Sequence, residues 1–125
     1  MSKKAEDTPM MKQYREARES LEEDTLLFFR LGDFYEMFEK DAERGAALLG
    51  ITLTKRHDMP MAGFPYHSAD GYLTKLLKGG HKVAICEQLE DPKMTKTIVE
   101  RGITEMVTPG VSINDNILNH RETNF

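Results

Sequence analysis

The sequence predicts a mixed α and β (α+β) fold, in which about three helices flank a mixed β-sheet. Apolar residues recur at steps of three and four in three segments, and short apolar runs of strand length lie between those segments. Glycine and proline residues separate them. Strands that alternate with helices favour a sheet with helices packed against it. The length of 125 residues is that of a single domain.

The first helix is predicted to begin after Thr8, because Pro9 follows and proline suits the first helical position. After an acidic break, the segment TLLFFRL at residues 25–31 is a nearly continuous apolar run, typical of a strand covered on both faces. The buried face of the first helix is marked by apolar residues at steps of four, three and four, namely Met10, Tyr14, Ala17 and Leu21.

A second helix is predicted to begin at Asp33 and to end at Gly50. Asp33 is the expected N-cap, and Glu36, three residues later, completes a capping box. Phe34 then occupies the first helical position, where its side chain either projects outward or packs between the helix and the sheet. Its position lies outside the apolar stripe, which consists of Phe38, Ala42, Gly45 and Leu49.

The next segments are a strand, a loop and a third helix. Residues 51–54 alternate between apolar and polar side chains, which predicts a half-buried strand that ends in Lys55 and Arg56. The loop HDMPMAGFP follows, because its two prolines and one glycine exclude a helix. The third helix is expected to end at residues 79–80 and to turn four side chains inward, those of Tyr72, Leu73, Leu76 and Leu77.

The last predicted elements are strands. Residues 83–86 form a buried apolar run, and a strand or hairpin is expected at about residues 99–107. Residues 108–110 then end the compact part of the chain.

The composition excludes several classes of protein. The longest apolar run, residues 26–29, is far shorter than a bilayer span, and the N-terminus has no apolar stretch of a signal peptide. We therefore expect a cytoplasmic protein without a membrane partner. The single cysteine, Cys86, excludes an internal disulfide and is expected to be an inert buried thiol, because its neighbours are apolar.

Charge is distributed unevenly along the chain. The net charge is −4, but residues 45–82 carry five basic and two acidic side chains and three of the four histidines. The flanking thirds are acidic, with −4 in residues 1–44 and −3 in residues 83–125. The middle third is therefore the part best suited to an anionic partner.

Two enzymatic patterns are incomplete in this sequence. Residues 45–50 have the glycine spacing of a phosphate-binding loop, but Ile51 stands where the lysine is needed. Residues 66–70 contain the residue types of a hydrolytic triad, yet neighbours in sequence seldom form one, and helix capping explains them better. A small hydrolase that uses His67 stays a distant alternative. A metal site of His57, Asp58 and His67 is not expected, because no helix or strand spacing supports it.

A series of motifs points to a family. The blocks FRLGDFYEMF, TLTKR, PMAGFPYH, VAICEQLEDP, VER and VTPG follow one another across residues 28–110. In this order they resemble the N-terminal mismatch-recognition domain of the MutS family of DNA mismatch-repair proteins, over nearly the whole chain. The core motif of that domain is Phe-x-Glu, which Phe34 and Glu36 match.

The resemblance implies specific roles. Phe34 would wedge into the minor groove beside a mispaired or unpaired base, and Glu36 would form a hydrogen bond with that base. Lys55 and Arg56 are neighbours on an extended segment, so only one can reach the same groove, and Arg56 is the residue we expect there. Contacts with sugar and phosphate are implied for Asp33, Arg56, the segment from Met61 to Gly63, and Arg101.

The sequence departs from the family pattern in three places. Leu31 replaces a common methionine, and the block before Arg101 lacks the usual Lys-Gly. The loop from His57 to Met59 is shorter than in many relatives, so backbone contacts implied for that loop are not carried over.

The resemblance also implies the organisation of the molecule. Residues 1–110 would form the mismatch-recognition domain, and residues 111–125 a linker to a connector domain that the chain does not contain. We expect no catalytic residue, metal or cofactor in this chain, because ATP and magnesium belong to the ATPase region of the full-length family protein. The expected partner is double-stranded DNA with mismatches or small loops, and the full-length protein would be a homodimer that recruits MutL.

The predicted mechanism depends on the stability of base stacking. Opening a base step costs a few kcal/mol, and least at a mispaired base, so an inserted ring is accepted preferentially at a defect. The alternative is a protein-interaction or structural domain without DNA binding, in which Phe34 belongs to the core.

Overall fold

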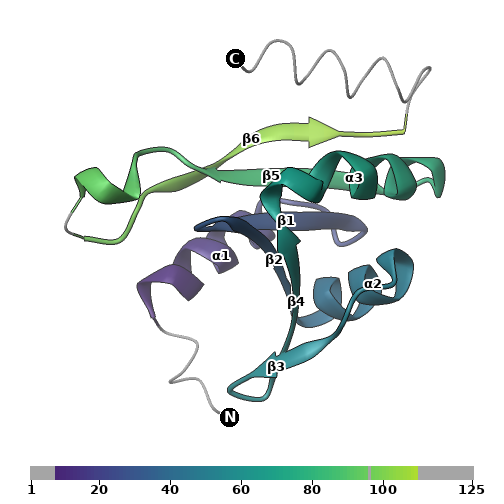
Figure 1. The fold of residues 1–125 in the computed structure, drawn as a ribbon, viewed down its shortest axis with the longest axis horizontal. Helices are drawn as coiled ribbons and strands as arrows, with labels where there is room; N and C mark the ends of the chain where they lie inside the picture. The colour runs from purple at the N-terminus through teal and green to yellow at the C-terminus, as the bar shows by residue number, and fades with distance from the viewer. Residues whose placement is uncertain (1–7, 96, 110–125) are drawn as a thin grey trace.

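The structure is a computed structural model that describes residues 8–95 and 97–109 (Figure 1). The predicted boundary at residue 110 and the linker at residues 111–125 lie outside this range. The helices are α1 (Pro9–Glu19), α2 (Glu39–Leu49) and α3 (Ala69–Lys78), with short 3-10 turns at η2 (Tyr66–Ser68) and η3 (Pro92–Met94). The strands are β1 (Thr25–Leu31), β2 (Phe34–Phe38), β3 (Thr54–Arg56), β4 (Met59–Pro65), β5 (Lys82–Gln88) and β6 (Arg101–Val107).

The six strands form one mixed sheet in the order β3-β4-β2-β1-β5-β6. β1 and β5 run parallel, and the other neighbouring strands are antiparallel. This confirms the predicted α+β class with a mixed sheet. None of the helices in the described part of the chain is long and apolar enough to cross a membrane.

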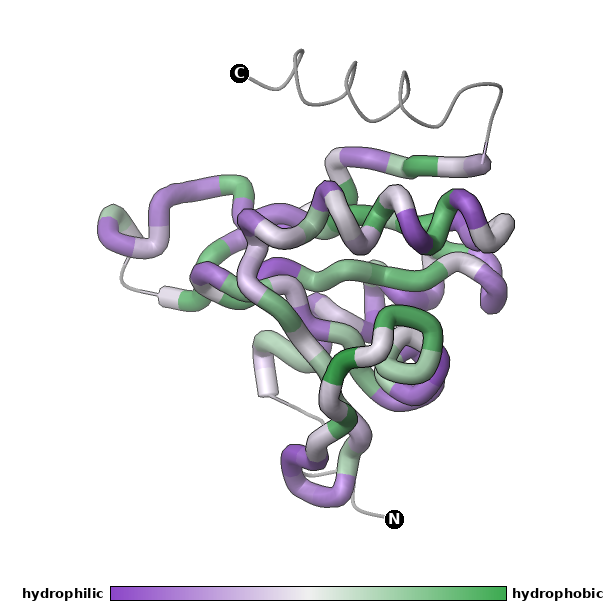
Figure 2. Tube along the Cα trace, turned by 45° about the vertical axis from the view of Figure 1, so that its right-hand side comes forward, coloured by the Kyte–Doolittle hydropathy of each residue, from purple (hydrophilic) through white to green (hydrophobic). Residues whose placement is uncertain are grey.

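Helices cover both faces of the sheet, so the core has two layers (Figure 1). One layer lies under α2 and α3, and the other lies under α1. β1 contributes to both, with Phe28 in the first and Phe29 in the second. In Figure 2 the turn between β3 and β4, at the bottom of the view, is hydrophilic, in contrast to the hydrophobic central strands.

Several predicted elements are confirmed. Thr8 caps α1 through its side-chain oxygen, which accepts a hydrogen bond from the Met11 N–H. TLLFFRL is β1, and its first five residues are buried because the helical layers cover both faces. α2 ends at Gly50, whose φ of 72° is the left-handed conformation that glycine tolerates. The predicted buried run at residues 83–86 lies within β5.

The predicted start of the second helix is wrong. Phe34 and Glu36 lie on strand β2, and α2 begins at Glu39 after Phe38. β1 and β2 form a hairpin whose two-residue loop is Gly32 and Asp33, so Asp33 is a turn residue and not a helix cap. Pairing of β2 with strands on both sides satisfies its backbone, which outweighs the local preference for a capping box.

The predicted loop HDMPMAGFP is also wrong. His57 and Asp58 form a tight turn with φ values of 53° and 67°, a pattern typical of a type I′ hairpin. The remaining residues form β4, which tolerates its prolines because Pro60 lies beyond the residues that pair with β2 and Pro65 is the last residue of the strand. The strand predicted for residues 51–54 is shorter than expected and begins at Thr54.

Candidate nucleic-acid interface

The site predicted from the sequence lies on the face of the sheet that α1 partly covers. Side chains alternate along β2, so Phe34, Glu36 and Phe38 share this face. Phe38 is fully buried in the α1 layer, Glu36 is half-buried, and Phe34 is 43% exposed. The α1 layer therefore ends before Phe34, so the Phe34 ring does not belong to the core.

Strand pairing brings the other predicted residues of this region to the same face. Gly63 lies opposite Glu36, and Met61 lies opposite Phe38. On β3, Arg56 pairs with Met59, two residues before Met61, so Arg56 also shares this face. The neighbouring Lys55 points to the opposite face, in line with the preference for Arg56.

The carboxyl group of Glu36 lies directly over Gly63. A Cβ atom at Gly63 would lie 2.5 Å from the Glu36 Cδ and 2.7 Å from its Oε2. Burial raises the pKa of Glu36 above its ordinary value, and the charge of Arg56 partly opposes this shift. The carboxyl group is thus held against the sheet in an environment that raises the cost of its charged form.

A shallow hollow of about 430 Å³ adjoins Phe34 and Glu36. It exists because β3 pairs only with residues 59–61 of β4 and leaves residues 62–65 at an open edge of the sheet. An open edge gives a partner access to the backbone as well as to side chains. The hollow is lined by Phe34, Glu36, Ile51, Thr52, Thr54, Met61, Gly63, Phe64, Pro65 and Tyr72.

Two residues that the sequence analysis did not select, Tyr66 and Arg30, lie beside the β1–β2 turn. Arg30 is on the face of the sheet opposite Phe34, over the Tyr35 ring, and forms an ion pair with Glu87 at 2.9 Å. The N–H of Tyr66 donates a hydrogen bond to the carbonyl oxygen of Asp33 at 2.8 Å, which fixes the tyrosine beside the β1–β2 turn. The guanidinium group of Arg30 lies 4.1 Å from the centre of the Tyr66 ring, and the ring is 44% exposed. The apolar run TLLFFRL gave no signal for this contact, because the contact joins residues that are 36 positions apart in the chain.

Arg101 has a different environment from Arg56. Its side chain donates hydrogen bonds to the Arg30 carbonyl oxygen at 2.7 Å and to Gln13 Oε1 at 2.7 Å, and its guanidinium carbon lies 5.3 Å from the centre of the Phe29 ring. Burial lowers the pKa of Arg101. Arg101 therefore lies on the same face of the sheet as Phe29 and Glu36, where its hydrogen bonds join β6 to β1 and α1.

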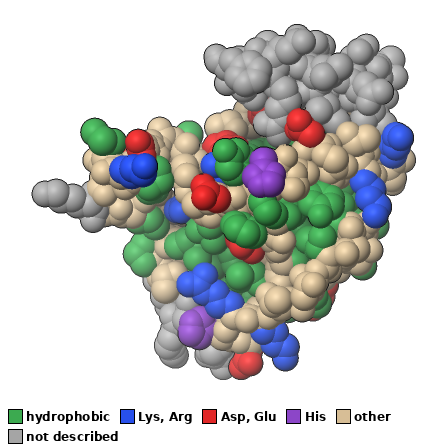
Figure 3. All heavy atoms as spheres, viewed as in Figure 1, with side chains coloured by type: hydrophobic (Ala, Val, Ile, Leu, Met, Phe, Trp, Pro, Cys, Tyr) green, Lys and Arg blue, Asp and Glu red, His purple; other side chains and the backbone are tan. Residues whose placement is uncertain are grey.

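One face of the molecule combines hydrophobic and basic side chains. In Figure 3 hydrophobic side chains gather in the middle of this face, lysine and arginine side chains lie below and to the right of them, histidines lie above and below, and a few acidic side chains lie among and above them. Phosphate groups are recognised by such basic side chains, whereas bases and sugars contact apolar surface.

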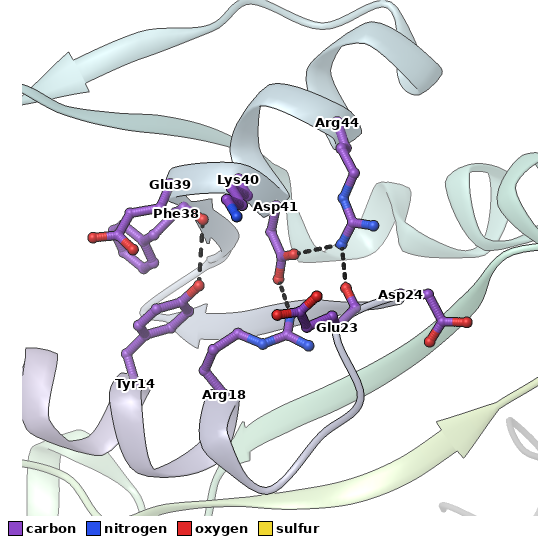
Figure 4. A pocket seen from close by; sticks show the side chains of 9 residues that line it. All are labelled: Tyr14, Arg18, Glu23, Asp24, Phe38, Glu39, Lys40, Asp41 and Arg44. Atoms are coloured by element: carbon purple, nitrogen blue, oxygen red, sulfur yellow. Dashed lines mark hydrogen bonds and ion pairs between the residues drawn. The ribbon is translucent and has the colours of Figure 1, made fainter.

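A second cavity, of about 520 Å³, lies between α1 and α2 (Figure 4). Its centre is Asp41, which is only 3% exposed and forms ion pairs with Arg18 and Arg44. Asp41 Oδ2 also accepts a hydrogen bond from the Leu27 N–H at 3.1 Å. Asp41 offsets one of the two arginine charges, and Glu23, Asp24 and Glu39 also line the cavity, so it has the character of a structural junction and not of an anion site.

The remaining candidate groups do not assemble into a site. No cluster of three or more His, Cys, Asp or Glu side chains within residues 8–95 and 97–109 could hold a metal ion. Cys86 is buried and forms no disulfide, as expected for an inert thiol.

Comparison with known proteins decides the family. A sequence profile described as MutS domain I matches residues 8–116. The chain belongs to the MutS domain I family. This agrees with the motif order found in the sequence.

Relatives of MutS domain I in this comparison are named DNA mismatch repair protein MutS. The protein from Parabacteroides distasonis is 58% identical over 127 aligned residues, covering 98% of this chain and 14% of the relative. The protein from Flavobacterium psychrophilum is 57% identical, covering 99% of this chain and 15% of the relative. The protein from Porphyromonas gingivalis is 54% identical, covering all of this chain and 14% of the relative. The chain therefore spans about one seventh of the length of these MutS proteins.

Proposed function

We propose that this chain recognises mismatched or looped DNA as the first domain of a MutS-type repair protein. The observation that carries the proposal is the exposed Phe34 ring beside the half-buried Glu36 carboxyl group, at the end of this face of the sheet that α1 leaves open. Membership of the MutS domain I family supports the same function.

Phe34 is the proposed wedge. Its position at the start of β2, directly after a two-residue turn, presents the ring at an end of the sheet where a minor groove can approach it. Stacking an aromatic ring on a base returns about 1–3 kcal/mol, which offsets the cost of opening a mispaired step more fully than that of a paired step. The preference for a mismatch then comes from the deformability of the DNA.

Glu36 is the proposed base contact. A carboxylate near phosphates weakens every DNA complex, but a hydrogen bond to a displaced base recovers part of this cost only at a mismatch. The raised pKa of Glu36 makes the protonated form more accessible, and that form donates a hydrogen bond to a base nitrogen.

Arg56 is the proposed phosphate contact on the same face. It lies at the exposed β3–β4 turn, and no acidic side chain forms an ion pair with it among the described residues. Met61 supplies apolar surface beside Glu36. The exposed turn residue Asp33 is proposed to approach the DNA backbone next to Phe34.

Several activities belong to the proposal for the whole protein and not to this chain. They are ATP hydrolysis with magnesium, formation of a homodimer and recruitment of MutL. All of them would reside in the six sevenths of the MutS relatives that this chain does not span.

The experiment is a titration of labelled duplexes, one fully paired and one with a single G·T mismatch, at several salt concentrations. We expect tighter binding to the mismatched duplex and a negative slope of affinity against salt, because counterions are released from the phosphates. The same titration with Phe34→Ala should lose the preference for the mismatched duplex. Leu89→Ala is the matched control for that variant, since Leu89 is a similarly exposed hydrophobic residue that follows β5, two strands away from β2. Binding that is absent or independent of salt would instead favour the protein-interaction alternative.

A further inference from the structure

Gly63 has an unusual place for a glycine. It lies inside strand β4, paired with Glu36 of β2. Glycine weakens the interior of a strand, because it has no side chain to pack and loses more backbone entropy than other residues. The backbone does not require it, since the residues with positive φ include Gly32, Gly50 and Gly80 but not Gly63. The reason for glycine at this position must therefore be space.

That space is occupied by Glu36. The three atoms nearest to a Cβ at position 63 all belong to the Glu36 carboxyl group, with Cδ at 2.5 Å and Oε2 at 2.7 Å. Real Cβ atoms almost never approach other atoms so closely. Any side chain at position 63 would force the carboxyl group to move.

We propose that Gly63 is a positioning residue that holds the Glu36 carboxyl group low against β4, at the place where it meets a base displaced by Phe34. The inference rests on the function proposed above for Glu36. It assigns to Gly63 a role through Glu36, in place of the direct sugar or phosphate contact that the sequence resemblance implies.

The groups that face Glu36 account for its environment. Its paired neighbours on this face are Phe29 of β1 and Gly63 of β4, and neither side chain is ionisable. Arg56 of β3 is the charged group that acts on it. Burial of the carboxyl group between the Phe29 side chain and the Gly63 backbone raises its pKa, and the positive charge of Arg56 lowers it.

An alanine at position 63 would displace the carboxyl group toward solvent. The backbone of β4 has no need of glycine, so the fold should persist. Greater exposure lowers the cost of the charged form, so the pKa of Glu36 should move back toward its ordinary value. The displaced carboxyl group should also lose its contact with the base.

The first test is a carbon-13 NMR titration of the Glu36 carboxyl group in the free chain. We expect Gly63→Ala to lower the pKa of Glu36 and the control Gly71→Ala to leave it unchanged, because no atom lies within 4 Å of a Cβ at Gly71. An unchanged pKa of Glu36 in Gly63→Ala would overturn the inference, whatever the DNA measurements give.

The second test compares mismatch preference, the ratio of affinities for mismatched and paired duplexes. Gly63→Ala should lower this ratio by about the same factor as Glu36→Ala, and the double variant should equal Glu36→Ala alone. A further loss in the double variant would mean that the glycine admits the DNA backbone directly, which contradicts the inference. A lowered pKa with full mismatch preference would uphold the positioning role and reject the proposed function of Glu36.

Stability gives a third readout if Gly63→Ala folds poorly. Removal of the carboxyl group removes the clash, so Glu36→Ala should restore the free energy of unfolding that Gly63→Ala loses. A double variant that stays unfolded would show that position 63 needs glycine for another reason, and the inference would fail.

Discussion

Phe34 and Phe38 lie on the same face of β2, four residues apart, yet the first ring is 43% exposed and the second is fully buried. The ring of Phe38 packs 4.8 Å from that of Tyr14, whose hydroxyl group donates a hydrogen bond to the Phe38 carbonyl oxygen at 3.3 Å (Figure 4). Helix α1 thus covers one end of this face and leaves the other end open. Two phenylalanines on one strand therefore have separable roles.

Phe34→Ala should lower the free energy of unfolding by about 1 kcal/mol or less and remove the preference for a mismatch, because the ring is largely outside the core. Phe38→Ala, the matched variant, should cost about 3–5 kcal/mol, since it leaves a cavity under α1. Urea denaturation and duplex titration measure the two effects. A loss of several kcal/mol in Phe34→Ala would place that ring in the core and reject the wedge.

Glu36→Ala and Glu36→Gln should both tighten binding to fully paired duplex, by about fivefold or about 1 kcal/mol, because each removes a negative charge from the DNA face. Glu36→Ala should lose more of the mismatch preference than Glu36→Gln, since glutamine keeps a hydrogen-bond donor. Parallel titrations of both variants check this. Unchanged affinity for paired duplex in both variants would remove Glu36 from the interface.

Glu36 should also make stability depend on pH. Burial raises the pKa of Glu36 in the folded chain above its ordinary value of 4.5, so the folded state binds more protons than the unfolded state in that range. The contribution of Glu36 to the free energy of unfolding should therefore be fully present below pH 4.5 and fall as the pH rises through the raised pKa. Denaturation curves of the chain and of Glu36→Gln at several pH values should show the variant gaining relative stability with rising pH, and the opposite trend would contradict the assignment.

Arg56 and Arg101 should respond differently to substitution. Arg56→Ala should change the free energy of unfolding by about 0.5 kcal/mol or less and reduce the salt slope of DNA binding by about 1, as expected for loss of one phosphate contact. Arg101→Ala should lower the free energy of unfolding by about 1–3 kcal/mol, because Arg101 donates hydrogen bonds to Arg30 and Gln13. If Arg101→Ala changes only the salt slope, its role is that of a DNA contact.

Cys86 should resist alkylation in the folded chain. Burial raises the pKa of its thiol to about 11 from the ordinary 9.0, so the reactive thiolate is about 100-fold less abundant than in an ordinary thiol. Labelling with iodoacetamide at pH 8 should be slow in buffer and fast in concentrated urea. Rapid labelling of the native chain would show that β5 opens readily or that the thiol is accessible.

The amino-acid sequence determined those elements whose information is local. The Thr8–Pro9 pair and the apolar stripe after it specify α1, the apolar run at residues 25–31 specifies β1, and Gly50 specifies the end of α2. The order of motifs across residues 28–110 was sufficient to place the chain in its family. In each case neighbouring residues carry the signal, because helix capping, periodicity and turn formation act within a few residues.

Tertiary structure alone decided the conformation of the residues that matter most. The segment from Asp33 to Glu36 has the local pattern of a helix start. Because β2 pairs with both β1 and β4, Asp33 instead lies in a turn and residues 34–36 lie in a strand. The alternation along that strand then exposes Phe34 and places Glu36 over Gly63, and the short turn at His57 and Asp58 brings Arg56 to the same face. These contacts join residues about 20–27 positions apart in the chain. Only the strand register determines which side chains share a face, because a shift of one residue moves every side chain of a strand to the other face of the sheet.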